Sequence, residues 1–163
     1  MKIIAIVACL HLVTIPVIAG REPQISRPVS ERVRMSTHII VGEVIMLRVV
    51  NATDGREVAR HSKDLARNEK MEVAIRVLDV LQSDRLYPLK PGDNVTVRFG
   101  EEGYTISVIE AFLTKTRRIF FLTTQAEELS YFFPLFGSSN LSCAEEKLGD
   151  VKAAIKSIAD AAK

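Results

Sequence analysis

The 163-residue sequence has no tryptophan, two cysteines and three histidines, and its aromatic side chains are seven Phe and three Tyr. Two cysteines exclude a disulfide-rich scaffold. The charges nearly cancel, with 22 Lys and Arg against 20 Asp and Glu, so no strong field of one sign favours nucleic acid as a partner. With 47% hydrophobic and 26% charged residues, the chain has the length and composition of one folded domain.

Residue patterns that carry catalysis or bind metals are also missing from the sequence. It contains no H-E-x-x-H motif, no Cys-x-x-Cys motif and no Gly-rich phosphate loop. Beyond the N-terminal segment its histidines are His38 and His61, which do not have the close spacing of metal ligands. We therefore expect no metal, no cofactor and no enzyme activity.

The first residues have the pattern of a secretory signal peptide. Lys2 precedes an apolar stretch over residues 3–18, and the small residue Ala19 follows it. This pattern predicts a signal peptide over residues 1–19, cleaved after Ala19 or Gly20, and a secreted or periplasmic protein. The alternative is a retained membrane anchor, although a spanning helix needs about 20 apolar residues.

The mature chain begins with a polar, proline-containing lead-in over residues 20–35, which we expect to be extended and to end in a short helical turn at 30–35. Alternating β-branched segments then predict strands. The first starts at His38 and contains Gly42, which indicates a bulge or a sharp bend. The long polar connection over residues 51–69 has room for a short helix around 57–67. The later strands are expected over residues 71–80, 94–99, 104–113, 118–123 and 131–136.

The C-terminal segment changes to a helical period. Ser142-x-x-Glu145 is a capping-box pattern, which predicts a helix over residues 143–161. Its apolar face is formed by residues at helical spacing, namely Leu148, Val151, Ile155 and Ile158.

The order of these elements predicts a mainly β fold. No helix alternates with the strands, which argues against a parallel βαβ sheet. We expect a small antiparallel barrel of five to six strands over residues 36–140, with the C-terminal amphipathic helix of residues 141–163 packing on the barrel.

Four segments of the sequence resemble strands of exported OB-like barrels. They are residues 36–44, 73–81, 95–99 and 117–122. Tissue inhibitors of metalloproteinases and netrin-like modules share this barrel, so the resemblance, over residues 30–136, implies an OB-like fold. Those inhibitors act through an N-terminal cysteine, whereas this mature chain begins near Gly20 or Arg21. The resemblance therefore does not imply protease inhibition by that mechanism.

The segment over residues 131–136 has the highest aromatic density of the chain. Alternation along a strand buries about half of such a segment, so the rest forms an exposed patch unless the C-terminal helix covers it. We consider this segment, together with two arginines at the start of the strand predicted before it, a candidate binding site for a protein or cell-envelope partner. The candidate residues are Tyr131, Phe132, Phe133, Phe136, Arg117 and Arg118.

Cys143 is the one cysteine of the mature chain. At the start of the predicted helix the dipole favours a thiolate, which makes Cys143 a candidate reactive thiol; the alternative is a buried, inert side chain. We predict an exported, non-catalytic binding module without nucleic-acid binding, and without membrane contact after signal cleavage. The alternatives are a thiol-dependent enzyme or redox protein using Cys143, and a membrane-tethered surface protein that retains its N-terminal segment.

Overall fold

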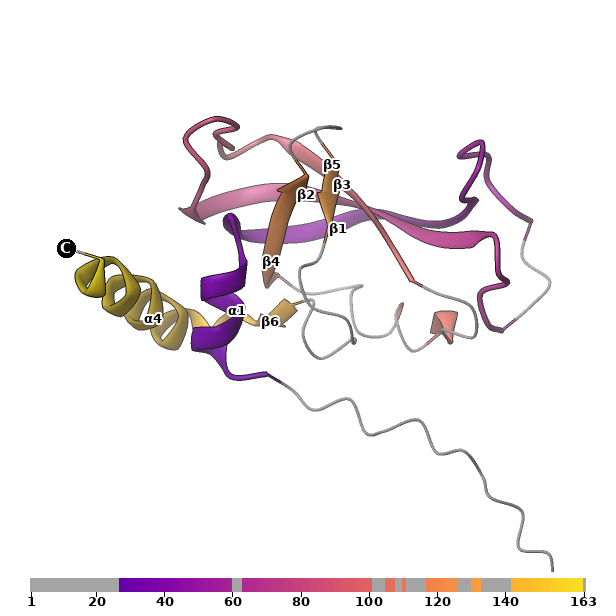
Figure 1. Ribbon diagram of the computed structural model, residues 1–163. Coiled ribbons are helices and arrows are strands. Elements are labelled where there is room, and N and C mark those ends of the chain that lie inside the picture. The colour runs from indigo at the N-terminus through magenta and orange to yellow at the C-terminus, as the bar shows by residue number, and fades with distance from the viewer. Residues whose placement is uncertain are drawn as a thin grey trace, which may run out of the picture.

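The computed structural model describes residues 27–59, 63–100, 105–107, 110, 117–125, 130–132 and 142–162 (Figure 1). The predicted signal peptide over residues 1–19 lies outside these ranges. The elements follow in the order α1 (Val29–Met35), β1 (His38–Asn51), β2 (Glu69–Gln82), β3 (Asn94–Phe99), β4 (Arg118–Gln125), β5 (Ser130–Phe132), β6 (Ser142–Ala144), the 3-10 helix η1 (Glu145–Lys147) and α4 (Leu148–Ala161).

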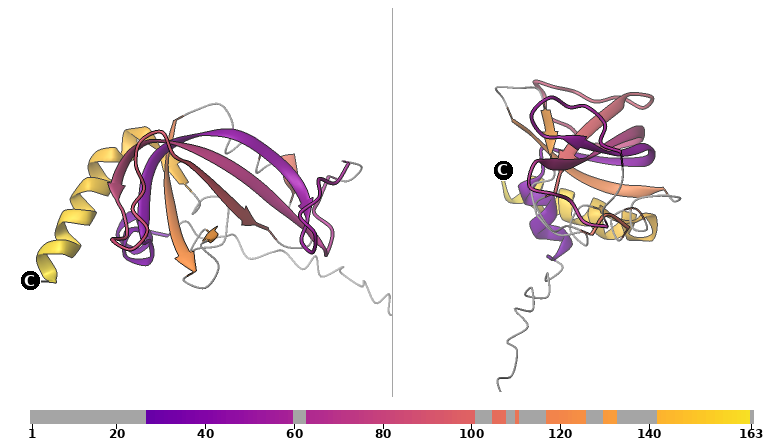
Figure 2. Two further views of the ribbon diagram at one scale, coloured as in Figure 1. Left: turned by 90° about the horizontal axis from the view of Figure 1, so that it is seen from above. Right: turned by 90° about the vertical axis from the view of Figure 1, so that its right-hand side faces the viewer.

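The strands form one mainly antiparallel sheet in the order β1-β2-β3-β5-β4-β6 (Figures 1 and 2). Strand β1 pairs with β2 along most of its length and also with β4 through its first residues, from His38 to Gly42. Strands β3 and β5 meet in a single parallel pair, Val97 with Tyr131. The prediction of a mainly β antiparallel fold with a C-terminal helix is therefore confirmed, while the ladder is not closed into a continuous barrel.

The sheet buries side chains on both of its faces. The inner face carries the larger core, with fully buried residues of β1, β2, β3 and β4 such as Ile40, Val73, Val97 and Phe120. The other face is covered over the start of β1 and over β4, where Val151 of α4 packs in a second buried cluster. Leu81 at the end of β2 also packs against this cluster, whereas no residue of β3 or of the second half of β1 belongs to it.

The prediction of a bulge at Gly42 is confirmed. The register between β1 and β2 shifts at Val41/Gly42, and a Cβ on Gly42 would lie 2.6 Å from the Ile75 Cγ2 atom and 2.8 Å from the Arg76 carbonyl oxygen. A second shift between Val44 and Met46 leaves Ile45 without a register partner. These irregularities allow β1 to bend, so that one strand serves both β2 and β4.

The predicted start of the C-terminal helix is wrong. Residues 142–144 form strand β6 against β4, and the helical backbone begins only with η1 and α4. The capping box does not form, because no side chain caps η1 and the Ser142 hydroxyl instead accepts a 2.7 Å hydrogen bond from Arg118 Nε. Pairing with β4 has overridden the local capping signal.

The apolar face of the helix is only partly used. Val151 is fully buried and Leu148 and Ile155 are half-buried, but Ile158 is exposed. In Figure 2 the C-terminal turns of α4 extend away from the sheet. The helix therefore packs on the sheet through its first half, next to α1.

The remaining segments confirm some predictions and overturn others. The helical turn at 30–35 is present as α1, and the strands predicted at 71–80 and 94–99 are present as β2 and β3. The strand predicted over 104–113 is wrong, because residues 106, 107 and 110 are helical and Thr105 makes only an isolated bridge with Asp64. The described residues between 57 and 67 contain no helix. Among the helices that the structure describes, none is long and apolar enough to cross a membrane.

Candidate binding surface

The outer face of β1, β2 and β3 carries three rows of side chains that run across the strands. The rows follow from the register, in which β2 pairs with β1 on one side and with β3 on the other. We call these residues the platform. They are Glu43, Arg76 and Asn94 in the first row, Met46, Ala74 and Thr96 in the second, and Arg48, Glu72 and Arg98 in the third.

The third row is built around a buried carboxylate. The Glu72 side chain is only 4% exposed, and Arg98 Nε donates to its Oε2 at 2.7 Å while Arg48 Nε donates to its Oε1 at 2.8 Å. Burial raises the pKa of Glu72, but hydrogen bonds and positive charge from Arg98 and Arg48 outweigh it and hold the pKa below its ordinary value. Glu72 therefore stays ionised and fixes two guanidinium groups in place.

Both guanidinium groups of this row still face solvent. The Arg98 side chain is 56% exposed and the Arg48 side chain 35% exposed, because Glu72 occupies only part of their donor capacity. Donors that are held in position lose little side-chain entropy when they bind a partner. This row is thus suited to binding carboxylates or carbonyl oxygens.

The other two rows add a looser ion pair and an apolar centre. In the first row Arg76 Nη1 lies 3.5 Å from Glu43 Oε1, and both side chains are about half exposed. In the second row Met46 is exposed and Ala74 is buried. The platform therefore presents three arginines and two glutamates around an apolar centre, and Arg and Met are enriched in protein interfaces.

The site predicted from the aromatic segment is only partly described. Tyr131 and Phe132 belong to β5, whereas Phe133 and Phe136 lie outside the described residues. Arg117 is exposed, with its Nη1 3.9 Å from Glu145 Oε1. Arg118 is half-buried and donates to the Ser142 hydroxyl. The two arginines are thus engaged at the β6–η1 end of the sheet, and whether they join the aromatic residues in one site stays a prediction.

The position of Cys143 removes the reason for expecting a reactive thiol. The residue lies on β6, opposite Ile119 of β4, and is 8% exposed rather than placed at a helix N-terminus. Burial raises the pKa of the Cys143 thiol, and the positive charges of Arg32 and Arg118 offset this only in part. Burial and a raised pKa both disfavour the thiolate, which is the nucleophilic form of cysteine.

The histidine that could serve such a thiol as a base is already engaged. His38 is fully buried, with its Nε2 2.8 Å from the Tyr87 carbonyl oxygen and its Nδ1 2.9 Å from Thr37 Oγ1. His61 lies outside the described residues. Within the described ranges, His, Cys, Asp and Glu side chains do not gather in groups of three or more that could hold a metal ion.

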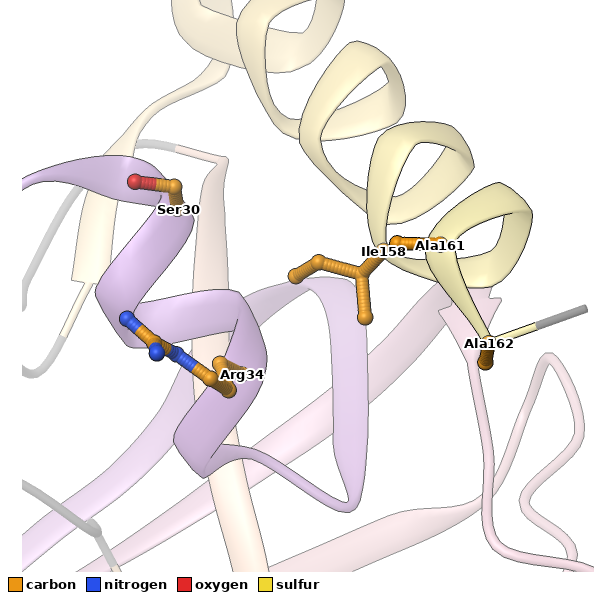
Figure 3. A pocket seen from close by; sticks show the side chains of 5 residues that line it. All are labelled: Ser30, Arg34, Ile158, Ala161 and Ala162. Atoms are coloured by element: carbon orange, nitrogen blue, oxygen red, sulfur yellow. The ribbon is translucent and has the colours of Figure 1, made fainter.

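A pocket of about 320 Å³ lies between α1 and α4 (Figure 3). It is lined by Ser30, Arg34, Ile158, Ala161 and Ala162, all of which are exposed. In Figure 3 the Ile158 side chain points from α4 toward α1, whereas the Arg34 side chain extends along α1 with its guanidinium group away from α4. It is an open depression between helix ends, with one charged group, and offers less to a ligand than the platform does.

Comparison of the sequence with protein-family models and with curated proteins finds no match. The function is therefore inferred from the residues and their geometry.

Sequence reasoning missed the platform as a site, although it identified part of its composition. The alternation in β2 already assigns Glu72, Ala74 and Arg76 to one face, and that in β3 assigns Thr96 and Arg98 to one face. The missing information was the register, which determines that Glu72 lies between Arg48 and Arg98. Register depends on long-range pairing, which a single sequence does not reveal.

Proposed function

We propose that this chain is an exported, non-catalytic binding module, secreted or periplasmic, whose platform docks a protein or cell-envelope partner. The observation that carries the proposal is the pair of solvent-facing guanidinium groups, Arg48 and Arg98, which the buried Glu72 carboxylate holds in position. A surface that served only solubility would not require two arginines fixed by a buried acid.

We further propose that the strands form a partly open OB-like barrel, as the resemblance to tissue inhibitors of metalloproteinases and netrin-like modules implies. The pairing of β4 with β1 and the parallel contact between β3 and β5 support this arrangement, because β4 then connects to β1 directly and to β3 through β5. OB-like barrels bind ligands on the face of their second and third strands. The platform lies on β2 and β3 together with part of β1.

The chemistry of the platform favours a protein partner with exposed carboxylates. Guanidinium groups bind carboxylates in a planar, bidentate geometry. The platform carries three arginines but also two glutamates, so its excess positive charge is too small to favour nucleic acid. The apolar side chain of Met46 provides the centre that protein interfaces use, surrounded by a polar rim.

A photocrosslinking amino acid at Thr96 tests this proposal in the exporting cell. Thr96 is exposed at the β3 end of the second row of the platform, and Leu86, which is 78% exposed, provides a control position outside it. We expect a discrete protein adduct from position 96 and none from position 86. Adding Arg76→Ala to the Thr96 probe should reduce the adduct severalfold, because it removes a guanidinium group of the platform without disturbing the buried carboxylate.

Two results would overturn the proposal. One is the same adduct pattern from positions 96 and 86, which would show random encounter. The other is an adduct at position 96 that neither Arg76→Ala nor Arg98→Ala reduces, which would show that the charged rows do not contribute to binding.

A further inference from the structure

In the part of the chain that the structure describes, the middle of β1 is paired along one edge only, and we call its other edge the free edge. Residues 38–42 pair with β4, and at the other end Val49 and Val50 contact the returning chain, where Val58 N donates to the Val49 carbonyl oxygen and Val50 bridges Glu57. Between them, residues 43–48 pair only with β2 in the part of the chain that the structure describes. No described strand pairs with the other edge of residues 43–48, and the backbone donors and acceptors of such an edge are the groups that another strand binds.

This edge also exposes apolar side chains. Ile45 is 42% exposed and Met46 is 36% exposed, and they are neighbours at the irregularity where β1 and β2 shift register. Proteins usually protect an edge strand with charged residues at its centre. Here the charges stand at the two ends of the segment, at Glu43 and Arg48, and the apolar residues occupy its middle.

The segment is complementary to itself when it is read in the antiparallel direction. A two-fold axis between Ile45 and Met46 would place Glu43 opposite Arg48 of a second copy, and Arg48 opposite Glu43 of that copy. The same axis would pair Val44 with Leu47 and Ile45 with Met46. Opposite charges and apolar pairs at directly opposed positions stabilise antiparallel strands.

We propose that the free edge of β1 binds the same edge of a second copy of this chain, so that two sheets join into one across a two-fold axis. Directly opposed residues of two antiparallel strands must point to the same face of the sheet. Glu43 and Arg48 meet this condition, because they pair with Arg76 and Glu72 on the platform side. An axis perpendicular to the sheet keeps both platforms on one side, as an isologous contact requires.

The pairing would also continue the charge pattern of the platform. The third row alternates in sign along Arg98, Glu72 and Arg48, and Glu57 Oε2 lies 3.9 Å from Arg48 Nη1 at the end of the row. In the dimer, Glu43 of the second copy would join Glu57 beside Arg48, and Arg76 of that copy would come next. The inference goes beyond the proposed function, because it assigns the edge of the sheet, whereas the proposed function assigns its face.

Sedimentation velocity of the mature chain, from about 1 µM to 1 mM, tests the proposal. We expect a dimer that dissociates on dilution. Ile45→Lys places a charge in the middle of the edge and should weaken dimerisation at least about tenfold. Leu86→Lys makes the same change in charge and polarity at an exposed apolar residue outside the edge, and should leave the dimer intact.

A charge exchange tests the register. In a dimer of Glu43→Lys, the new lysine would face Arg48 of the other copy at both ends of the pairing. In a dimer of Arg48→Glu, the new glutamate would face Glu43 of the other copy. Each variant alone should therefore be monomeric. Mixed in equal amounts they restore both opposite-charge pairs and should form a heterodimer. If Arg48→Glu fails to fold beside Glu72, as circular dichroism would show, Ile45→Lys and Leu86→Lys decide the question.

Three results would overturn the proposal. They are a wild-type chain that stays monomeric over the whole concentration range, an Ile45→Lys variant that dimerises like Leu86→Lys, and two folded charge variants that do not associate when mixed.

Discussion

At the residue scale, the platform depends on a single buried carboxylate. Glu72 is the one acidic residue among the buried described residues, and it accepts hydrogen bonds from two strands. Removing one partner of a buried ion pair leaves the other charges uncompensated, whereas exposed pairs contribute little to stability. The same residue therefore links the stability of the sheet to the geometry of its proposed binding surface.

We predict that Glu72→Gln lowers the free energy of unfolding by about 1–2 kcal/mol at pH 7, less than for a fully buried pair because both arginines are partly exposed. The pKa of Glu72 is lowered in the folded state, so the stability it contributes is present above its ordinary value of 4.5 and is lost as the pH falls further. Urea unfolding of both proteins should show a difference that shrinks below this pH.

The matched control is Glu43→Gln, which removes a carboxylate from an exposed ion pair of the same platform. Its effect should stay within about 0.5 kcal/mol. Equal losses for the two variants, or a Glu72→Gln effect that does not change at low pH, would contradict the role assigned to Glu72.

The contribution of Cys143 to the free energy of unfolding should change with pH in the opposite direction to that of Glu72. The pKa of Cys143 is raised in the folded state by burial, so the neutral thiol contributes stability below its unfolded pKa of about 8.5, and this contribution is lost as the pH rises through the folded pKa. Cys143→Ala should lower the free energy of unfolding by about 1 kcal/mol at pH 7, because packing is lost. The difference in the free energy of unfolding between this variant and the wild type should become smaller in alkaline buffer. A difference that grows with pH would indicate a stabilised thiolate.

At the element scale, Gly42 shows why β1 bends where it does. A Cβ at this position would lie 2.6 Å from Ile75 Cγ2 and 2.8 Å from the Arg76 carbonyl oxygen, so it would force the two strands apart. We predict that Gly42→Ala lowers the free energy of unfolding by about 1–3 kcal/mol. Thermal unfolding measures this directly.

Gly149→Ala provides the matched comparison, because a Cβ at that position in α4 would meet nothing within 4 Å. It should raise the free energy of unfolding by about 0.5–1 kcal/mol, since alanine favours a helix. If Gly42→Ala left the free energy of unfolding unchanged, the strands would separate without cost and the bend would have another cause.

Helix α4 should divide into a packed half and an exposed half. Val151 is fully buried in the second core, whereas Ile158 is exposed beyond it. We expect Val151→Ala to cost about 1–3 kcal/mol in the free energy of unfolding and Ile158→Ala less than about 0.5 kcal/mol. Comparable losses for both would show that the whole apolar face is covered in solution.

Local sequence predicted the elements whose pattern agrees with their tertiary environment. Strand β3 was predicted with its observed bounds, because alternation buries Val95 and Val97 and leaves Thr96 exposed. The capping box at Ser142 failed because the hydroxyl bonds to Arg118, 24 positions away in the chain. The strand expected over 104–113 failed because a short apolar segment fits strand and helical periods alike. The failure at Ser142, like the missed platform, comes from long-range contacts.

At the scale of the whole molecule, we infer an exported protein that binds rather than catalyses. Cys143 is buried on a strand, His38 is engaged in hydrogen bonds, and the platform holds two partly exposed guanidinium groups in fixed positions. The alternatives make different demands. A thiol enzyme needs an accessible Cys143, and a tethered protein needs its N-terminal segment to be retained.

Intact mass spectrometry of the exported native protein, after brief treatment with a thiol-alkylating reagent, tests this inference most directly. We predict a mass that begins at Gly20 or Arg21, with Cys143 unmodified until the protein is unfolded. A full-length mass would contradict export with cleavage, and rapid alkylation of native Cys143 would contradict a binding module with an inert thiol.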